Sequence, residues 1–173
     1  MRRLLKRGLA YLIDCTICYS LLMLIGQWAI ISNIRETIGI TDEWFRDSLN
    51  TELYVLITIS LPVWIYFTYF DSNRSKGTFG KRMMNLSVRN SADRERITLG
   101  RSFKRTFFKL LPWEIAHIGV IFPTPLYFME EPEVRFLTIL GILLLVGFAL
   151  SILFDAHGRS IYDRLAGTEV IDK

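Results

Sequence analysis

Residues 136–154 read FLTILGILLLVGFALSILF, a run that contains no charged side chain. A second uncharged run, LYVLITISLPVWIYFTYF, fills residues 53–70. A helix needs about 20 predominantly apolar residues to cross the hydrocarbon core of a bilayer. Both runs are close to that length, so the sequence predicts an integral membrane protein.

Two further apolar runs are interrupted by polar residues. Residues 9–31 contain Asp14 and Gln27, and residues 105–122 contain Glu114 and His117. Hydrophobic residues make up 51% of the 173-residue chain, a share too high for a soluble domain of this size. We therefore expect an all-α membrane protein, a single domain over residues 1–173 with four transmembrane helices.

The charges between the runs predict how the chain is oriented. Residues 71–102 hold eight Lys or Arg against three acids, and the stretch before residue 9 is also basic. Residues 32–52 and 123–135 are acidic instead. Basic loops stay in the cytoplasm, so both termini, including the tail 155–173, are predicted to face the cytoplasm from the inner membrane. We attribute the net charge of +4 to these basic cytoplasmic segments, which orient the protein in the membrane, and we expect no nucleic-acid partner.

The basic segment 71–102 has a predicted structure of its own. Residues 78–85 fit a short amphipathic helix at the membrane surface. Residues 86–88 and 97–99 alternate apolar and polar side chains around a polar turn, which predicts a small β-hairpin. Residues 168–170 are a candidate third strand.

The two halves of the chain resemble each other. Phe70-Asp71 and Phe154-Asp155 each end an apolar run and precede a basic motif, and Asp14 and Glu114 each interrupt the first run of their half. One interpretation is a repeat of two helical hairpins related by an axis along the membrane normal. The other is a chance similarity between two membrane hairpins.

Asp14 is the strongest candidate for a functional residue, because a carboxylate inside a membrane helix costs at least a few kcal/mol unless it is paired, hydrated or protonated. It would bind a cation or a proton, or form a structural ion pair with Arg7, Arg105 or Lys109. Glu114 and His117 lie one helical turn apart and could relay protons; the alternative is that both are hydrogen-bonded near the interface.

Other patterns favour a structural role. Cys15 and Cys18 form a C-x-x-C inside an apolar helix, where buried thiols are inert. We predict no metal site, no cofactor and no catalytic residue, because no nucleophile–base pair is evident. The chain is therefore not expected to be an enzyme.

Nearly the whole sequence resembles the RDD family of membrane proteins. The resemblance rests on Arg7 and Asp14 in the first run, on a glycine-containing basic motif after the second, and on a closing motif near the C-terminus. The motif positions are Thr78, Gly80, Lys81, Arg82, Asp163, Arg164, Gly167 and Thr168. The family's second aspartate is matched by Asp163, with Asp71 as the alternative. Some members are described as sodium/proton antiporters, so the resemblance implies transport.

The predicted function is therefore a small cation/proton transporter that works as a homo-oligomer among membrane lipids. Asp14 would bind a monovalent cation or a proton, Glu114 and His117 would relay protons, and Arg7 would tune the pKa of Asp14. The alternative is a non-transporting membrane adaptor or scaffold. Its basic cytoplasmic face would bind a protein partner or anionic lipid.

Overall fold

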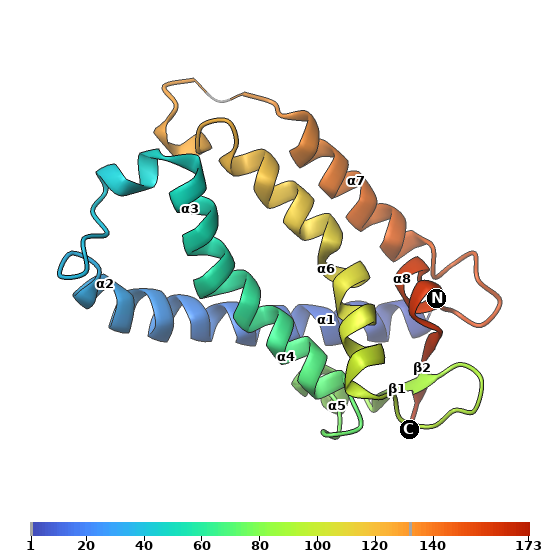
Figure 1. The fold of residues 1–173 in the computed structure, drawn as a ribbon. Helices are drawn as coiled ribbons and strands as arrows, with labels where there is room; N and C mark the ends of the chain where they lie inside the picture. The colour runs from blue at the N-terminus through green and yellow to red at the C-terminus, as the bar shows by residue number, and fades with distance from the viewer. Residues whose placement is uncertain (1, 132) are drawn as a thin grey trace.

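The computed structural model of the protein describes residues 2–131 and 133–173. The side chains of Arg2 and Arg3, which belong to the basic N-terminal stretch, lie outside this description. Two long helical rods form its first half (Figure 1). The first comprises α1 (Arg2–Leu21), the π-helical η1 (Leu22–Ile31) and α2 (Ser32–Ile34). The second, after a short η2 (Glu43–Arg46), comprises α3 (Ser48–Val55), the π-helical η3 (Leu56–Ser60) and α4 (Leu61–Asp71).

The second half contains α6 (Leu99–Ile121) and α7 (Phe136–Leu150), joined by a loop with a short η4 (Leu126–Phe128). These two helices run side by side in Figure 1. Two glycines allow their close approach: a Cβ on Gly141 would lie 2.6 Å from the carbonyl oxygen of Pro112, and one on Gly119 would lie 2.4 Å from the backbone nitrogen of Thr138. Small residues at such contacts are typical of packed membrane helices.

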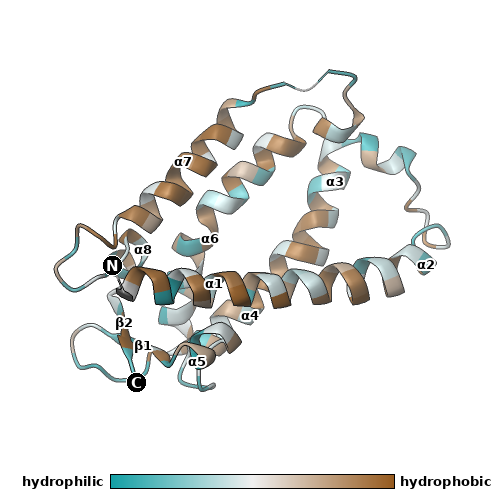
Figure 2. Ribbon diagram, turned by 180° about the vertical axis from the view of Figure 1, so that it is seen from behind, coloured by the Kyte–Doolittle hydropathy of each residue, from teal (hydrophilic) through white to brown (hydrophobic). Residues whose placement is uncertain are grey.

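Two helical rods are long and apolar enough to cross a bilayer, Leu4–Ile34 and Ser48–Asp71. In Figure 2 the ribbon is brown, the colour of hydrophobic residues, over most of α7 and much of α1, whereas α6 carries teal hydrophilic stretches. Helix α6 has 23 residues but two buried charged residues, Arg105 and Lys109, and α7 is apolar but has 15 residues. The structure thus supports a helical membrane protein, while the count of four spans stays a prediction.

Helix α7 ends four residues before the apolar run does. The Ser151 hydroxyl donates to the carbonyl oxygen of Phe148 at 2.7 Å and accepts the backbone N–H of Ile161 at 3.0 Å. These bonds tie the end of α7 to the start of the next helix, α8 (Ile161–Ala166). At about 1.5 Å per residue α7 is about 22 Å long, less than the roughly 30 Å of a hydrocarbon core.

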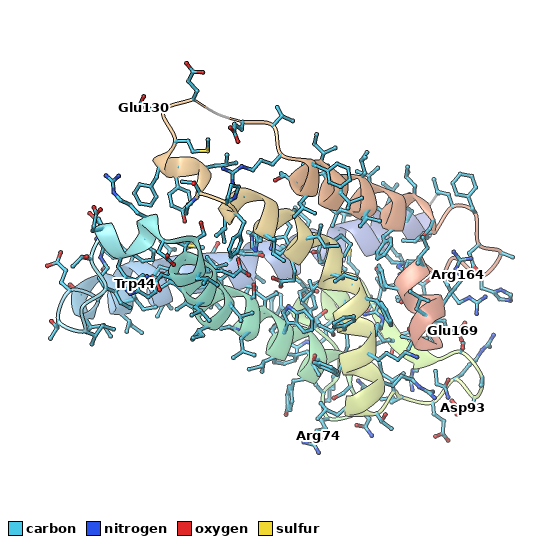
Figure 3. All side chains as sticks on the ribbon, turned by 45° about the horizontal axis from the view of Figure 1, so that its top comes forward. Trp44, Arg74, Asp93, Glu130, Arg164 and Glu169 are labelled. Carbon is cyan, nitrogen blue, oxygen red and sulfur yellow. The ribbon has the colours of Figure 1, made fainter. Side chains whose placement is uncertain are left out.

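Both termini lie at one end of the molecule, together with α5 (Phe79–Met83), α8 (Ile161–Ala166), β1 (Leu86–Asn90) and β2 (Thr168–Asp172) (Figure 1). We call this the charged end. In Figure 3, Arg74, Asp93, Arg164 and Glu169 lie at this end, whereas Trp44 and Glu130 lie at the opposite one.

The predicted β-hairpin is reduced to a single antiparallel bridge between Arg89 and Arg96, whereas the candidate third strand at residues 168–170 is present in β2 and pairs with β1. Strands β1 and β2 are antiparallel with Val88 opposite Val170, and the 97–99 segment forms no strand. Thr98 explains the difference: it caps α6 by accepting the backbone N–H of Arg101, so the chain turns helical at once. Ile97 is still buried, against Leu86, Val88 and Val170.

The amphipathic helix is present but shorter than predicted, since α5 covers only Phe79–Met83. Phe79 and Met83 are exposed, as expected for side chains that meet the membrane surface. Leu86 belongs instead to β1 and is buried.

The internal repeat is not confirmed and stays a prediction. The two predicted hairpins pack differently. Helices α6 and α7 contact each other extensively, whereas α1 packs chiefly against α5. The two aspartates of the recurring Phe-Asp pair also differ in environment. Asp71 is buried beside Lys81 and Arg105, whereas Asp155 pairs with Arg159.

Candidate functional site

Five charged side chains form one buried network at the charged end. Arg105 lies at its centre, with Nε 2.9 Å from Oδ1 of Asp163 and Nη1 2.6 Å from Oδ2 of Asp71. Lys81 Nζ lies 2.5 Å from the other oxygen of Asp71, and Arg7 donates to the other oxygen of Asp163. We call these residues, Arg7, Lys81, Arg105, Asp71 and Asp163, the charge network.

The charge network ties together elements that are far apart in sequence. Its members come from α1, α4, α5, α6 and α8. All are nearly fully buried, so each charge has lost water and depends on its partners. Removing one partner of such a pair typically costs about 3–5 kcal/mol. The charge network therefore holds the charged end together.

Asp163 has the densest set of contacts. It occupies the first turn of α8, where its side chain accepts the Ser160 backbone N–H at 3.1 Å and Ser160 caps the helix in return. Burial alone would raise the pKa of its carboxyl group. The charges of Arg105 and Arg7 and the hydrogen bonds outweigh burial, so that this pKa lies well below the usual value. Asp163 is therefore ionised throughout the physiological pH range.

Asp14 is also buried, but its partners carry no charge. One oxygen accepts the Tyr66 hydroxyl at 2.8 Å and the Gly80 backbone N–H at 2.7 Å, and the other accepts the Thr78 hydroxyl at 2.6 Å. Among the described residues no cation forms an ion pair with Asp14. The expected partners Arg7 and Arg105 bind Asp163 and Asp71 instead.

A cavity of about 30 Å³ separates Asp14 from the charge network. That volume suffices to hold a water molecule. Its lining includes Asp14 and four cationic side chains, those of Arg7, Lys81, Arg105 and Lys109. Lys109 is buried, with its Nζ 3.3 Å from the centroid of the Phe67 ring and 4.4 Å from that of Tyr11.

Glu114 and His117 lie farther along α6, towards the opposite end. Glu114 accepts the Trp64 indole N–H at 2.7 Å and the Ser60 hydroxyl at 3.0 Å, both from neutral donors. His117 packs on the edge of Trp113, and its buried Nδ1 has no hydrogen-bond partner among the described residues. Within the described residues, Glu114 and Asp14 share no hydrogen-bond partner.

The remaining motif positions have distinct roles. Thr168 donates to the backbone oxygen of Asp163 at 3.3 Å, and Gly167 ends α8 with a left-handed φ of 64°. Arg82 is exposed and lies over the Phe79 ring, and Arg164 is exposed. The motif around α5 thus supplies two of the three donors to Asp14, as well as Lys81, while the closing motif supplies Asp163.

Several contributing residues were missed by sequence reasoning. Tyr66, Ser60 and Trp64 lie in an uncharged apolar run that gives no signal of hydrogen bonding to a carboxylate. Asp71 was considered only as an alternative second aspartate, yet both Asp71 and Asp163 bind Arg105. The signal available was the position of Asp71 directly after the apolar run, because an acid at that depth requires a partner.

A model of the RDD family matches residues 1–167 of the chain. No curated protein and no solved structure shows significant similarity to it. The match covers the motif around α5 and the closing motif up to Gly167, and it confirms the resemblance to this family. The chain therefore belongs to the RDD family.

Proposed function

We propose that this protein is a small membrane transporter that exchanges protons for a monovalent cation. In this proposal four helices span the inner membrane and the charged end faces the cytoplasm. One observation carries the proposal: Asp14 is 1% exposed, yet within the described residues its hydrogen-bond donors are all neutral, and it lies beside a water-sized cavity.

Neutral partners suit a carboxylate that changes its protonation state. The hydroxyls of Tyr66 and Thr78 donate to the carboxylate, and each can rotate to accept a hydrogen bond from a protonated Asp14. Asp71 and Asp163 each contact two cations, so their protonation would leave buried positive charges unpaired. Asp14 is thus suited to exchange, and the charge network to holding the fold.

Glu114 and His117 are the residues that we propose to connect Asp14 with the other side of the membrane. Glu114 is likewise bound by neutral donors, and His117 has an unoccupied ring nitrogen among the described residues. We assign them the relay of protons between Asp14 and the opposite face. The exposed apolar surface of α1 would then be covered by lipid or by a second protomer, as in the predicted homo-oligomer.

The test is proton exchange in proteoliposomes that carry a pH gradient. Wild-type protein should dissipate the gradient when sodium or potassium ions are added, and Asp14→Asn should abolish that response, because the amide retains the shape but has no exchangeable charge. Asp155→Asn is the matched control, since Asp155 pairs locally with Arg159 outside the site. It should exchange like wild type.

The adaptor alternative is favoured by a different observation, the exposed basic side chains Arg74, Arg82 and Arg164 at the charged end. Such a surface suits an acidic protein partner or anionic lipid. The same assay separates the two functions. No cation-dependent exchange by wild type would reject the transporter and leave the adaptor, whereas normal exchange by a well-folded Asp14→Asn protein would reject the role of Asp14 in the exchange.

A further inference from the structure

A groove of about 250 Å³ runs between α1 and α7, which do not pack closely on each other. Its walls are largely apolar, formed by Leu4 and Gly8 of α1 and by Leu145, Val146 and Ala149 of α7. Leu145 and Val146 are exposed, so in a membrane the groove opens towards lipid. Four residues with polar groups also contribute to it: Arg7, Tyr11, Lys109 and Tyr162.

Lys109 is the unusual member of this lining. The side chain is 9% exposed, and its ammonium group has no ion pair or hydrogen bond within the described part of the chain. Its contacts are the rings of Tyr11 and Phe67. Cation–π contacts compensate only part of the lost hydration of a buried ammonium group, so an anion nearby would be strongly favoured.

The balance of charges around the small cavity also favours an anion near Lys109. Counted in their ionised forms, Arg7, Lys81, Arg105 and Lys109 bring four positive charges to the small cavity, against three negative charges from Asp14, Asp71 and Asp163. The first three cations contact Asp71 or Asp163, which leaves the excess charge on Lys109. Lys109 lines both the cavity and the groove, so a compensating anion can approach it from the groove.

We propose that the groove between α1 and α7 binds an anionic phospholipid from the leaflet at the charged end. An acyl chain lies against the apolar residues of α1 and α7, and the phosphate faces Lys109 and Arg7. The flexible stem of Lys109 lets its ammonium group reach towards the headgroup level. Basic pockets between membrane helices recognise anionic headgroups in this way. The site holds whether or not the protein transports ions.

The test uses the full chain in vesicles of equal parts phosphatidylglycerol and phosphatidylcholine. The protein is extracted in mild detergent, and its intact mass is measured with retained lipid. Wild type should retain phosphatidylglycerol in preference to phosphatidylcholine. Lys109→Met should reduce that preference by about fivefold or more, the effect of one Lys charge near an anionic lipid surface, and Lys109→Arg should preserve it. The control is Lys104→Met, an exposed lysine of the same helix, which should behave as wild type.

A second pair of variants tests the acyl-chain part without altering a charge. A Cβ on Gly8 or on Gly147 would meet no atom within 4 Å, so both positions have open space in which a larger side chain can start. Gly8 lines the groove and Gly147 does not. Gly8→Leu should lose the retained lipid, and Gly147→Leu should keep it.

Three results would overturn the proposal. They are equal retention of both lipids by wild type, an unchanged preference in Lys109→Met, and a lipid-free dimer, which would show that a second copy covers the groove. Should Lys109→Met fail to fold, Gly8→Leu still decides, because undiminished lipid retention by that variant contradicts the site.

Discussion

At the scale of single residues, two buried aspartates differ in the charge of their partners. Asp163 is bound by Arg7 and Arg105, whereas Asp14 is bound by two hydroxyls and one backbone N–H. Both are essentially inaccessible to solvent. A carboxylate bound by arginines is fixed in its ionised form, while one bound by neutral donors can be protonated without breaking an ion pair. The neutral donors therefore distinguish the exchanging carboxylate from the structural one.

The Thr78 hydroxyl should contribute measurably to stability. Thr78→Val removes one donor to the buried Asp14 carboxylate, which should cost about 1–3 kcal/mol of unfolding free energy. Thr106→Val is a matched control, because the Thr106 hydroxyl is buried and has no hydrogen-bond partner among the described residues. Thermal unfolding of the purified proteins should show a lower midpoint for Thr78→Val only. Equal midpoints in the two variants would contradict the assigned hydrogen bond.

Sequence reasoning identified the important residues better than it identified their partners. Asp14 was singled out because a carboxylate inside an apolar run requires an explanation, and Asp163 because it matches the closing motif of the family. That Asp14 would be bound by Tyr66 and Thr78 could not be predicted, because helical periodicity does not give the rotation of one helix relative to another.

At the scale of elements, α5 connects the site to the fold. It has only five residues, yet its N-terminal turn supplies the Gly80 N–H to Asp14 and its Lys81 binds Asp71. Gly80 lies directly against α1: a Cβ there would be 2.0 Å from the carbonyl oxygen of Ala10. Only glycine permits this approach, so the contact between α5 and α1 depends on that residue.

Gly80→Ala should displace α5 from α1 and remove the backbone donor to Asp14. We expect lower thermal stability and a loss of cation-dependent proton exchange in the fraction that folds. Gly100→Ala is the control, because a Cβ at Gly100 meets nothing within 4 Å and alanine favours a helix. A Gly80→Ala protein as stable and as active as Gly100→Ala would show that α5 tolerates displacement.

The strands show why pairing is harder to predict than element type. Residues 86–88 and 168–170 were both identified as candidate strands, but the predicted partner of the first was the nearby 97–99 segment. The cap at Thr98 commits that segment to α6, and the distant C-terminal strand pairs with β1 instead. Local sequence favours the nearest partner, whereas tertiary packing around Ala10 and Ile97 determines the actual one.

At the scale of the whole molecule, ion pairs join the helices at the charged end, whereas the helices away from it are less closely packed. The charge network joins five helices there, while α1 leaves a groove beside α7 and exposes most of its apolar surface. Such an arrangement suits a protein fixed at one membrane face that meets lipid or a second protomer within the bilayer.

The proposed orientation predicts the location of three positions. Reporters fused after Lys173 or inserted near Ala92 should be cytoplasmic, and one inserted near Asp42 should be external, because the flanking charges follow the positive-inside rule. Enzymatic reporters that are active on only one side of the membrane make the measurement. An external reading at Lys173 would contradict the four-span topology.

The central claim is that Asp14 releases a proton when a cation binds, and difference infrared spectroscopy tests it most directly. Adding sodium or potassium ions to protein in lipid should diminish the C=O band of a protonated carboxyl group in wild type. Asp14→Asn should lack that change, whereas Asp155→Asn should show it. A band change of the same size in Asp14→Asn, or no cation-induced change in wild type, would contradict the account.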